Sequence, residues 1–577
     1  MSGKFFQIYD IETYSPVDLK KYGARKYLCH KEARILTSYL INIKIPEFLE
    51  ALFDITLDKD IIVAHNAVFE AIALKRFYGT GEHVFFICTS ALSRWLGGPS
   101  SLQDCGIYWD LPNRKDFSGK ELVRYFKTYN PDDPDWSTNM KKLFEYCKQD
   151  VITTKDLFKK LLLLAIKEQG EERTAHELLA YNQTLQSNIK GITINVDKLN
   201  RFIKKRDILL NEKNKNFETL YNINPRSPKQ VLHWIQQRTP HIKILSTNAT
   251  YLTTIFTKLT PEVKAFIIAR QDLNSPIFKK LDVIKRRLIK NKLDPDLMHH
   301  GTDSGRYISM GVNVLNFPRG DANTSDEPKT LPSLKTSMRS LIVPSKPENK
   351  IVAIDYRQIE LRMSLYTLGY IDELEKLSKG WDLYHDFATL IFNTSSVSKD
   401  QRFRGKVWVL SIGYGAFPKR LAFEVGGLQH LEAATKAHKI YLQKMFPKTH
   451  DWWTAKLKEV SDCKTDTYAL RILNGSYKYL KRSRLLYTAE GRSKGIASVG
   501  GQIFSVHNQA CVREILKEKK NKLLEKGYHI LFDAHDEIVF DTKEKYVKDI
   551  AKIMESPISW LPNFKLQTDI DIRDSWG

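Results

Sequence analysis

The chain has 577 residues, of which 42% are hydrophobic and 11% aromatic, so it can form several packed domains and is not a disordered polypeptide. Its net charge of +23 favours a polyanionic partner, and because no apolar run approaches the ~20 residues of a membrane span, nucleic acid is favoured over a membrane. The six cysteines form no Cys-x-x-Cys pair, which argues against a disulfide framework or a zinc module and indicates a reducing compartment such as the cytoplasm.

Residues 1–165 contain predicted strands that alternate with predicted helices. The apolar segment 5–9 predicts a strand that ends in Asp10, and the segment 61–64 predicts a second strand that ends in His65 and Asn66. Residues 142–164 have the apolar spacing of a long helix. Strands that alternate with helices are typical of an α/β domain.

Residues 166–295 consist mostly of long amphipathic helical patterns, which are interrupted at Gly191 and at several prolines. The segment 279–290, which includes Lys285 and Arg286, interleaves cations with an apolar stripe. Such a segment is either a solvated helix face or, beside a nucleic-acid site, a helix that binds phosphates.

Two carboxylates in the last half of the chain follow predicted strands. Asp355 ends the apolar run 351–354, and Asp536 lies with His535 and Glu537 in the turn of an apolar hairpin. Strand ends that bring carboxylates to one point can hold two Mg²⁺ ions about 4 Å apart, which is the arrangement that phosphoryl transfer uses.

A predicted helix between these carboxylates carries a stripe with a four-residue period. Arg402, Lys406, Leu410 and Tyr414 recur within residues 401–415, so they lie on one slowly drifting face. Phosphates could lie against the two cations, and a base or sugar against the other two side chains. The alternative is an ordinary amphipathic helix with a basic edge.

Together these segments resemble the motifs of family A DNA polymerases. Residues 355–362, the stripe at 402–415 and residues 535–537 look like motifs A, B and C, in the same order and spacing. The resemblance covers most of the chain from about residue 185, and segments 302–306, 313–319 and 500–513 fit it too. It implies an α+β right hand: a linker and helical thumb at 166–295, a palm at 296–375 and 491–577, and fingers at 376–490.

The resemblance also implies a role for each matched residue. Asp355 and Asp536 would bind two Mg²⁺ ions, for which Mn²⁺ can substitute, while Glu537 would help near the primer end and Lys406 would donate a proton to pyrophosphate. Glu360 would pair with Tyr414 beside the sugar 2′ position. The remaining nucleotide contacts would be Arg402, Lys406, Leu410, Gln358, Tyr384 and His385. The DNA contacts would be Arg306, Gln509, Arg513, Asn316, Lys285 and Arg286.

The N-terminal domain resembles the 3′–5′ exonuclease domain of the same polymerases, which has an RNase H-like α/β fold. The resemblance implies that Tyr146 orients the attacking water and that four carboxylates bind two further metal ions, namely Asp10, Glu12, Glu70 and Asp150. Glu70 stands where the family usually has Asp. Arg357 stands where motif A usually has Ser, and Leu410 where motif B usually has Phe or Tyr.

The expected function is a template-directed DNA polymerase that extends a primer with deoxynucleotides and proofreads with a 3′–5′ exonuclease. Its partners would be primer–template DNA and dNTPs, with a helicase and a single-strand binding protein as candidate replisome partners and no membrane. The compact chain resembles phage replicases, which implies the cytoplasm of an infected bacterium. The alternatives are a single-subunit RNA polymerase and a nucleic-acid-binding scaffold with inactive sites.

Overall fold

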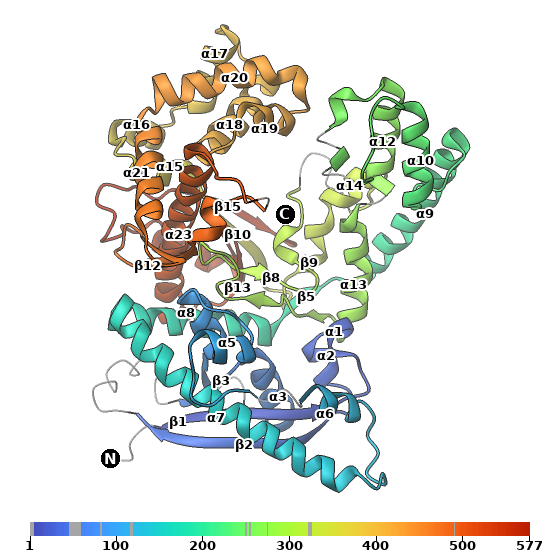
Figure 1. Cartoon of the computed structure of the whole chain (residues 1–577), viewed down its shortest axis with the longest axis vertical. Coiled ribbons are helices and arrows are strands. Elements are labelled where there is room, and N and C mark those ends of the chain that lie inside the picture. Colours follow the sequence, from blue (N-terminus) through green and yellow to red (C-terminus); the bar gives the residue numbers. More distant parts are fainter. Residues whose placement is uncertain are drawn as a thin grey trace.

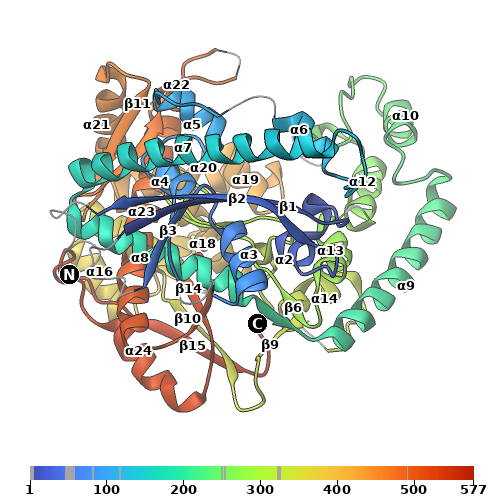
Figure 2. The same cartoon turned by 90° about the horizontal axis from the view of Figure 1, so that it is seen from below.

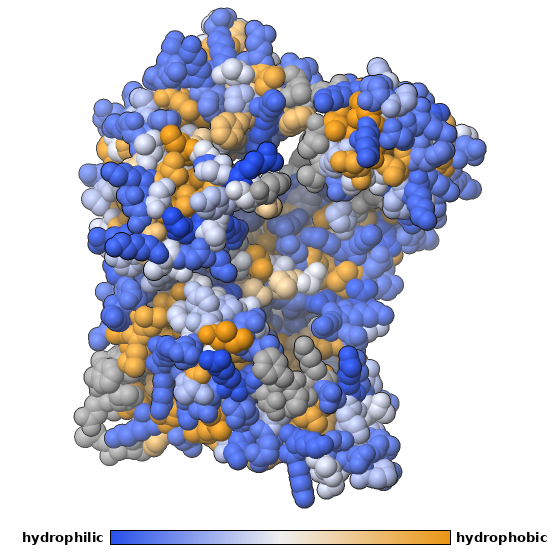
Figure 3. Space-filling model, in the orientation of Figure 1, coloured by the Kyte–Doolittle hydropathy of each residue, from blue (hydrophilic) through white to orange (hydrophobic). Residues whose placement is uncertain are grey.

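The computed structural model describes residues 5–45, 59–80, 84–115, 119–248, 251–252, 255–273, 275–320, 326–489 and 491–577. The N-terminal α/β unit lies at one end of the molecule, and two lobes rise from the opposite end on either side of a central sheet (Figure 1). The surface is hollowed between these two lobes (Figure 3). None of the described helices combines the length and apolar character needed to cross a bilayer.

The N-terminal unit is built on a four-stranded sheet in the order β2-β1-β3-β4. β1 (Phe5–Tyr14) pairs antiparallel with β2 (Arg34–Lys44) and parallel with β3 (Asp60–Ala64), which pairs parallel with β4 (Val84–Cys88). α7 (Trp136–Gln169) crosses β1 and β2, as Figure 2 shows from below. The shorter helices are α1 (Leu19–Tyr22), α2 (Ala24–Leu28), α3 (Val68–Tyr78), α4 (Thr89–Trp95), α5 (Leu102–Tyr108) and α6 (Gly119–Tyr125).

Both predicted strands and the predicted helix of this unit are present, so the α/β prediction is confirmed. The first strand does not end at Asp10, however. It continues to Tyr14, because residues 11–14 also pair with β2, across an irregularity between Glu12 and Thr13. Asp10 therefore lies within a paired strand and not at its end.

A long helical segment joins the N-terminal unit to one of the upper lobes. α8 (Glu171–Lys190) leads into β5 (Ile192–Ile194) and then into α9 (Val196–Tyr221), which projects away from the body (Figure 2). With α10 (Pro228–Arg238) and α12 (Pro261–Leu273) it forms a lobe, here called the arm, around stacked Trp234 and Phe266 rings. Ser227 caps α10 through the backbone of Gln230, and Pro228 follows at the first helical position. α13 (Lys279–Arg287) returns the chain to the body.

The central sheet has the order β13-β14-β10-β15 and is antiparallel throughout. Side chains alternate along β10 (Lys350–Tyr356): Val352 and Ile354 join one buried cluster, whereas Ile351 joins the cluster on the opposite face. The sheet is completed by β13 (Ile530–Ala534), β14 (Glu537–Thr542) and β15 (Thr568–Arg573). Its covering helices are α15 (Ile359–Thr367), α23 (Ile496–Glu525) and α24 (Val547–Glu555).

The other upper lobe, here called the helical lobe, has a buried core of its own that includes Trp408 and Phe387. It comprises α16 (Ile371–Ser378), α17 (Leu383–Phe392), α18 (Lys399–Gly413), α19 (Pro418–Glu424) and α20 (Leu431–Ile440). A capping box between Ser398 and Gln401 starts α18 two residues before the predicted start, and Tyr414 is its C-terminal cap.

The segment that follows the helical lobe contributes to the core of the central sheet instead. It contains α21 (Lys448–Asp462), the hairpin β11 (Thr467–Arg471) and β12 (Tyr477–Lys481), and α22 (Arg482–Leu486). The remaining strands and α-helix of the described residues are β6 (Lys292–Leu293), β7 (Leu297–Met298), β8 (Ile308–Ser309), α14 (Leu331–Thr336) and β9 (Ile342–Val343).

Candidate active sites

Three carboxylates, those of Asp355, Asp536 and Glu537, lie together at one end of the central sheet. β10 and β14 pair with Asp355 opposite Glu537, so the turn that carries Asp536 lies beside the end of β10. The guanidinium of Arg319 lies 2.9 Å from Asp355, 3.6 Å from Glu537 and 4.0 Å from Asp536. One cationic side chain therefore reaches all three carboxylates.

The electrostatics of Asp355 and Asp536 favour a bound cation. Burial and the neighbouring Asp355 raise the pKa of Asp536 to about 7, because two close carboxylates resist joint ionisation. Asp355 Oδ1 is buried and has no hydrogen-bond partner among the described residues. A hard divalent cation prefers such carboxylate oxygens and would relieve both conditions.

Asp355 and Asp536 open into a cleft of about 800 Å³ between the central sheet and the helical lobe. Arg402, Lys406 and Leu410 of α18 line this cleft together with Asp355 and Asp536. Arg402 Nε donates to Asp382 at 2.6 Å, and its guanidinium lies 5.7 Å from the centre of the Tyr384 ring. Three of the four residues of the predicted stripe thus face one space with the predicted metal ligands, whereas Tyr414 does not line it. Gln358, Glu360 and Tyr384 also line it, whereas His385 does not.

The contact predicted between Glu360 and Tyr414 is present. The Tyr414 hydroxyl donates to Glu360 Oε2 at 2.6 Å, and Arg306 forms an ion pair with Glu360 Oε1. Burial and the nearby Glu360 raise the pKa of Tyr414 well above its usual value, so the hydroxyl remains a donor. The family resemblance implied the Glu360–Tyr414 pair, but neither it nor local sequence patterns indicated the contact between Arg306 and Glu360, which are 54 positions apart.

A second acidic cluster lies in the N-terminal unit. Asp10 and Glu12 of β1 and Asp150 of α7 each offer an oxygen, and these oxygens lie within 4.8 Å of one another. Burial and mutual repulsion raise the pKa of Asp10 to about 6 and that of Glu12 to about 8. Lys115 forms an ion pair with Asp150, and its Nζ lies 4.7 Å from the centre of the Tyr146 ring. Like Arg319, Lys115 is a cation that sequence patterns did not indicate.

Glu70 is close to this cluster but is not one of its three converging members. It lies in the first turn of α3, is 4% exposed, and its Oε2 has no hydrogen-bond partner among the described residues. Burial and nearby Asp10 raise the pKa of Glu70 well above its usual value. A buried carboxyl oxygen without a hydrogen-bond donor fits a cation site, because a bound cation or a proton would compensate its charge.

Comparison with known proteins identifies the family. The model of DNA polymerase family A matches residues 195–577. The chain belongs to DNA polymerase family A. The DNA polymerase of Bacillus phage SP02 is 24% identical, over 98% of each chain. The thermostable DNA polymerase I of Thermus aquaticus is 22% identical, over 49% of this chain and 33% of its own length.

A solved structure extends the similarity to the fold. The polymerase domain of Pol1 from M. smegmatis, in complex with DNA primer-template and dNTP, superposes with a TM-score of 0.68 and 16% identity. The match covers 100% of this chain and 96% of that one. The polymerase is therefore a DNA-directed DNA polymerase that synthesises DNA on a template, and it has the mixed α/β multidomain fold of its family.

One predicted DNA contact of the polymerase is wrong. Arg513 is 3% exposed and its guanidinium forms ion pairs with Glu177 and Glu514, so it is not available to a ligand at the surface. The sequence prediction failed because Glu177 is 336 positions away. Gln509 remains partly exposed on the same helix and accepts a hydrogen bond from the Ser304 hydroxyl at 3.3 Å.

Three further predicted contacts lie in different surroundings. Asn316 and Lys285 are exposed and could meet a ligand. Arg286 instead donates to the carbonyl of Lys21 at 3.3 Å, so it packs against the N-terminal unit.

Glu537 is 5% exposed and accepts a hydrogen bond at 2.6 Å from Trp576, which lies next to the last residue of the sequence. Arg357, where motif A usually has Ser, forms an ion pair with Asp569 at 2.6 Å.

Proposed function

We propose that Asp355 and Asp536 hold the divalent cations of the polymerase site, with Mg²⁺ as the natural ion and Mn²⁺ as a substitute. The observation that carries this proposal is the meeting of both carboxylates with Arg402 and Lys406 in one cleft. Bound there, the cations would lower the pKa of the primer hydroxyl and neutralise charge on the leaving pyrophosphate.

The side chains of the helical lobe would handle the incoming nucleotide. Arg402 and Lys406 would bind its triphosphate, and Lys406 would give a proton to the departing pyrophosphate oxygen. Leu410 lines the same space and would contact the base or sugar, and Tyr384 and Gln358, which also line it, would be further nucleotide contacts. His385, which does not line the cleft, would contact a phosphate. Glu537 would help near the primer end.

Glu360 would select deoxyribose. Its carboxylate is held by Tyr414 and Arg306 on two sides, so it cannot move aside for a ribose 2′-hydroxyl without breaking both contacts. Primer–template DNA would contact the partly exposed Arg306 and Gln509 and the exposed Asn316 and Lys285.

The N-terminal unit would be an RNase H-like 3′–5′ exonuclease that removes misincorporated nucleotides. Asp10, Glu12 and Asp150 would hold its metal ions together with Glu70, and Tyr146 would orient the attacking water. The three converging oxygens support this assignment. Within the polymerase part, residues 166–295 would be the linker and thumb, 376–490 the fingers, and 296–375 with 491–577 the palm.

Two matched substitutions test both sites. Asp536→Asn should abolish primer extension with Mg²⁺ and dNTPs while digestion of single-stranded DNA from its 3′ end continues. Asp150→Asn should do the reverse. Each variant is the folding control for the other, and surviving extension in Asp536→Asn would disprove the metal assignment.

The same primer-extension and digestion assays distinguish the alternative functions. Efficient extension with rNTPs would favour an RNA polymerase, and no activity at either site would favour a binding scaffold. The likeness to a phage DNA polymerase over nearly its full length supports a role in phage genome replication in an infected bacterium, with a helicase and a single-strand binding protein as partners.

A further inference from the structure

A buried hub of charged and polar side chains joins the N-terminal unit to the polymerase part. The helix α8 carries the hub and contacts both the N-terminal unit and the polymerase part. Asn182 bonds both the N–H and the carbonyl of Phe86 in β4, at 2.8 and 2.7 Å, while Gln183 donates to Asn521 of α23 at 2.8 Å. α8 is therefore fixed between the two parts of the chain.

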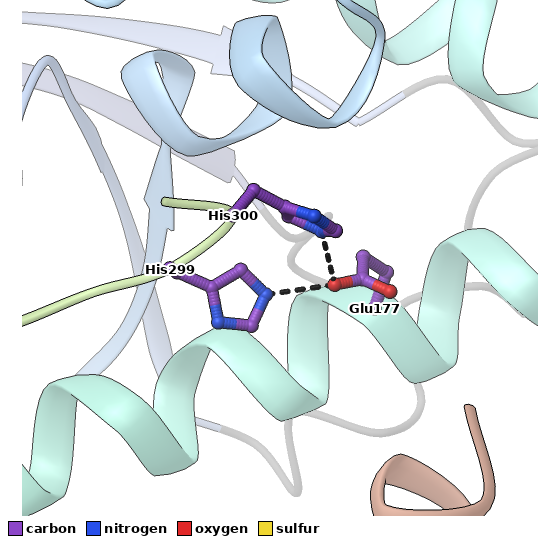
Figure 4. Close-up of side chains that lie close together, drawn as sticks. All are labelled: Glu177, His299 and His300. Carbon is purple, nitrogen blue, oxygen red and sulfur yellow. Dashed lines mark hydrogen bonds and ion pairs between the residues drawn. The ribbon is translucent and has the colours of Figure 1, made fainter. Parts of the chain in front are cut away.

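Glu177 of α8 is the centre of the hub. Its Oε1 accepts from His299 Nε2 at 2.7 Å and from His300 Nε2 at 2.8 Å, and both imidazoles point at this one oxygen (Figure 4). Its Oε2 accepts from Arg513 at 2.6 Å and from Lys517 at 3.1 Å. The carboxylate is thus bound from two elements, the turn at 299–300 and α23.

The charges of the hub identify it as a structural network and not a metal site. The arrangement of Glu177, His299 and His300 could geometrically hold an ion. However, Arg513 Nη2 also bonds Glu177 and lies 3.2 and 3.4 Å from the two histidine Nε2 atoms, so a guanidinium already occupies that position. Burial lowers the pKa of both histidines, which therefore stay neutral and donate through Nε2.

The turn that Glu177 contacts, residues 299–306, ends at Arg306, which pairs with Glu360 of the polymerase cleft. Gly301 N–H donates to the Arg306 carbonyl at 3.0 Å, and Arg306 N–H donates to the Thr302 hydroxyl at 3.0 Å. These bonds close residues 301–306 into a compact turn whose last side chain forms the ion pair with Glu360. A shift of the turn at its His300 end would consequently move Arg306.

The N-terminal unit also contacts the beginning of this turn. Arg94 Nε of α4 donates to the His299 carbonyl at 3.0 Å, and the Trp95 ring stacks on His300 with a centre-to-centre distance of 6.3 Å. The turn is thus held between α4, α8 and α23.

We propose that Glu177 is a positioning residue for sugar selection, acting through the 299–306 turn to hold Arg306 against Glu360. This proposal rests on the proposed role of Glu360. Although Glu177 belongs to the helix that follows the N-terminal unit, its effect would be measured at the polymerase site. Loss of its charge would leave Arg513 and Lys517 to share Glu514 as their counter-ion, and the two imidazoles and Arg513 would then compete for one neutral amide oxygen.

A double-mutant cycle tests the proposal. The readout is the ratio of kcat/KM for a ribonucleotide to that for the matching deoxynucleotide, on the same primer–template, so that changes in DNA affinity cancel. Glu177→Gln should raise this ratio roughly three- to tenfold, and Arg306→Ala should raise it at least as much. The double variant should equal Arg306→Ala alone, because both changes remove the same contact.

The matched control is Gln183→Ala, which removes the hydrogen bond between α8 and α23; among the described residues, Gln183 has no hydrogen bond or ion pair with residues 299–306. It should lower Tm and leave the ratio unchanged. If Glu177→Gln does not fold, His300→Gln probes the same link from the turn and should raise the ratio too. An unchanged ratio in the folded variant, or additive effects in the cycle, would overturn the proposal. If Glu360→Ala itself left the ratio unchanged, Glu360 would have no role in sugar selection, and the proposed role of Glu177 would be refuted as well.

Discussion

The Tyr414 hydroxyl lies 2.6 Å from Glu360 and connects the end of α18 to the start of α15. Because Glu360 lines the same cleft as Asp355 and Lys406, this hydrogen bond fixes a carboxylate at the position that we propose for the sugar of an incoming nucleotide. The geometry makes separate predictions for the two partners.

Glu360→Ala should raise ribonucleotide incorporation on the order of 10- to 200-fold, because it removes the side chain that we propose to exclude the 2′-hydroxyl. Tyr414→Phe leaves the carboxylate present but less well held, so the increase should be roughly tenfold or less. Single-nucleotide kinetics on a fixed primer–template measure both. A larger effect of Tyr414→Phe than of Glu360→Ala would contradict the assignment.

Arg319→Ala should strengthen divalent-ion binding in the absence of DNA. Arg319 contacts Asp355 at 2.9 Å and therefore competes with a cation for the same oxygens. Since an exposed ion pair is worth about 0.5–1 kcal/mol, the gain in Mn²⁺ affinity should be roughly two- to fivefold by isothermal titration calorimetry. Asp355→Ala is the control and should weaken binding. Weaker binding by Arg319→Ala would show that Arg319 supports the site instead.

Gly501→Ala should separate α18 from α23. A Cβ at this position would overlap the backbone of Gly415 and Tyr414, which cannot yield as a flexible side chain does. We expect a loss of about 1–3 kcal/mol in the free energy of unfolding, measured by denaturant titration. Gly495→Ala, at the start of the same helix, meets no atom within 4 Å and should cost less. Equal effects would mean that the close approach is unimportant.

His507→Gln should change how stability depends on pH. Burial lowers the pKa of His507 to about 4. Between pH 6.5 and 4 the unfolded chain binds this proton and the folded chain does not, so the histidine's contribution to stability falls as pH falls. The stability difference between wild type and variant should therefore shrink by up to about 3 kcal/mol from pH 7 to pH 4. A constant difference would show that His507 titrates normally when folded.

Local patterns predicted much of the fold. The apolar runs before Asp355 and around Asp536 became paired strands of one sheet, and the four-residue spacing of Arg402, Lys406 and Leu410 became one face of α18. These predictions needed only the periods of strands and helices. The predicted end of β1 at Asp10 was wrong because a strand's length also depends on its partner, and β2 continues beside it.

The sequence by itself determined where the carboxylates and the basic stripe lie on their strands and helix, since backbone periodicity depends on near neighbours. Only the tertiary structure decided which charges became partners. It buried Arg513 against Glu177, placed Arg306 on Glu360 and brought Arg319 to the paired aspartates. The reason is physical: whether a cation faces solvent, DNA or a buried carboxylate depends on groups that lie far away along the chain.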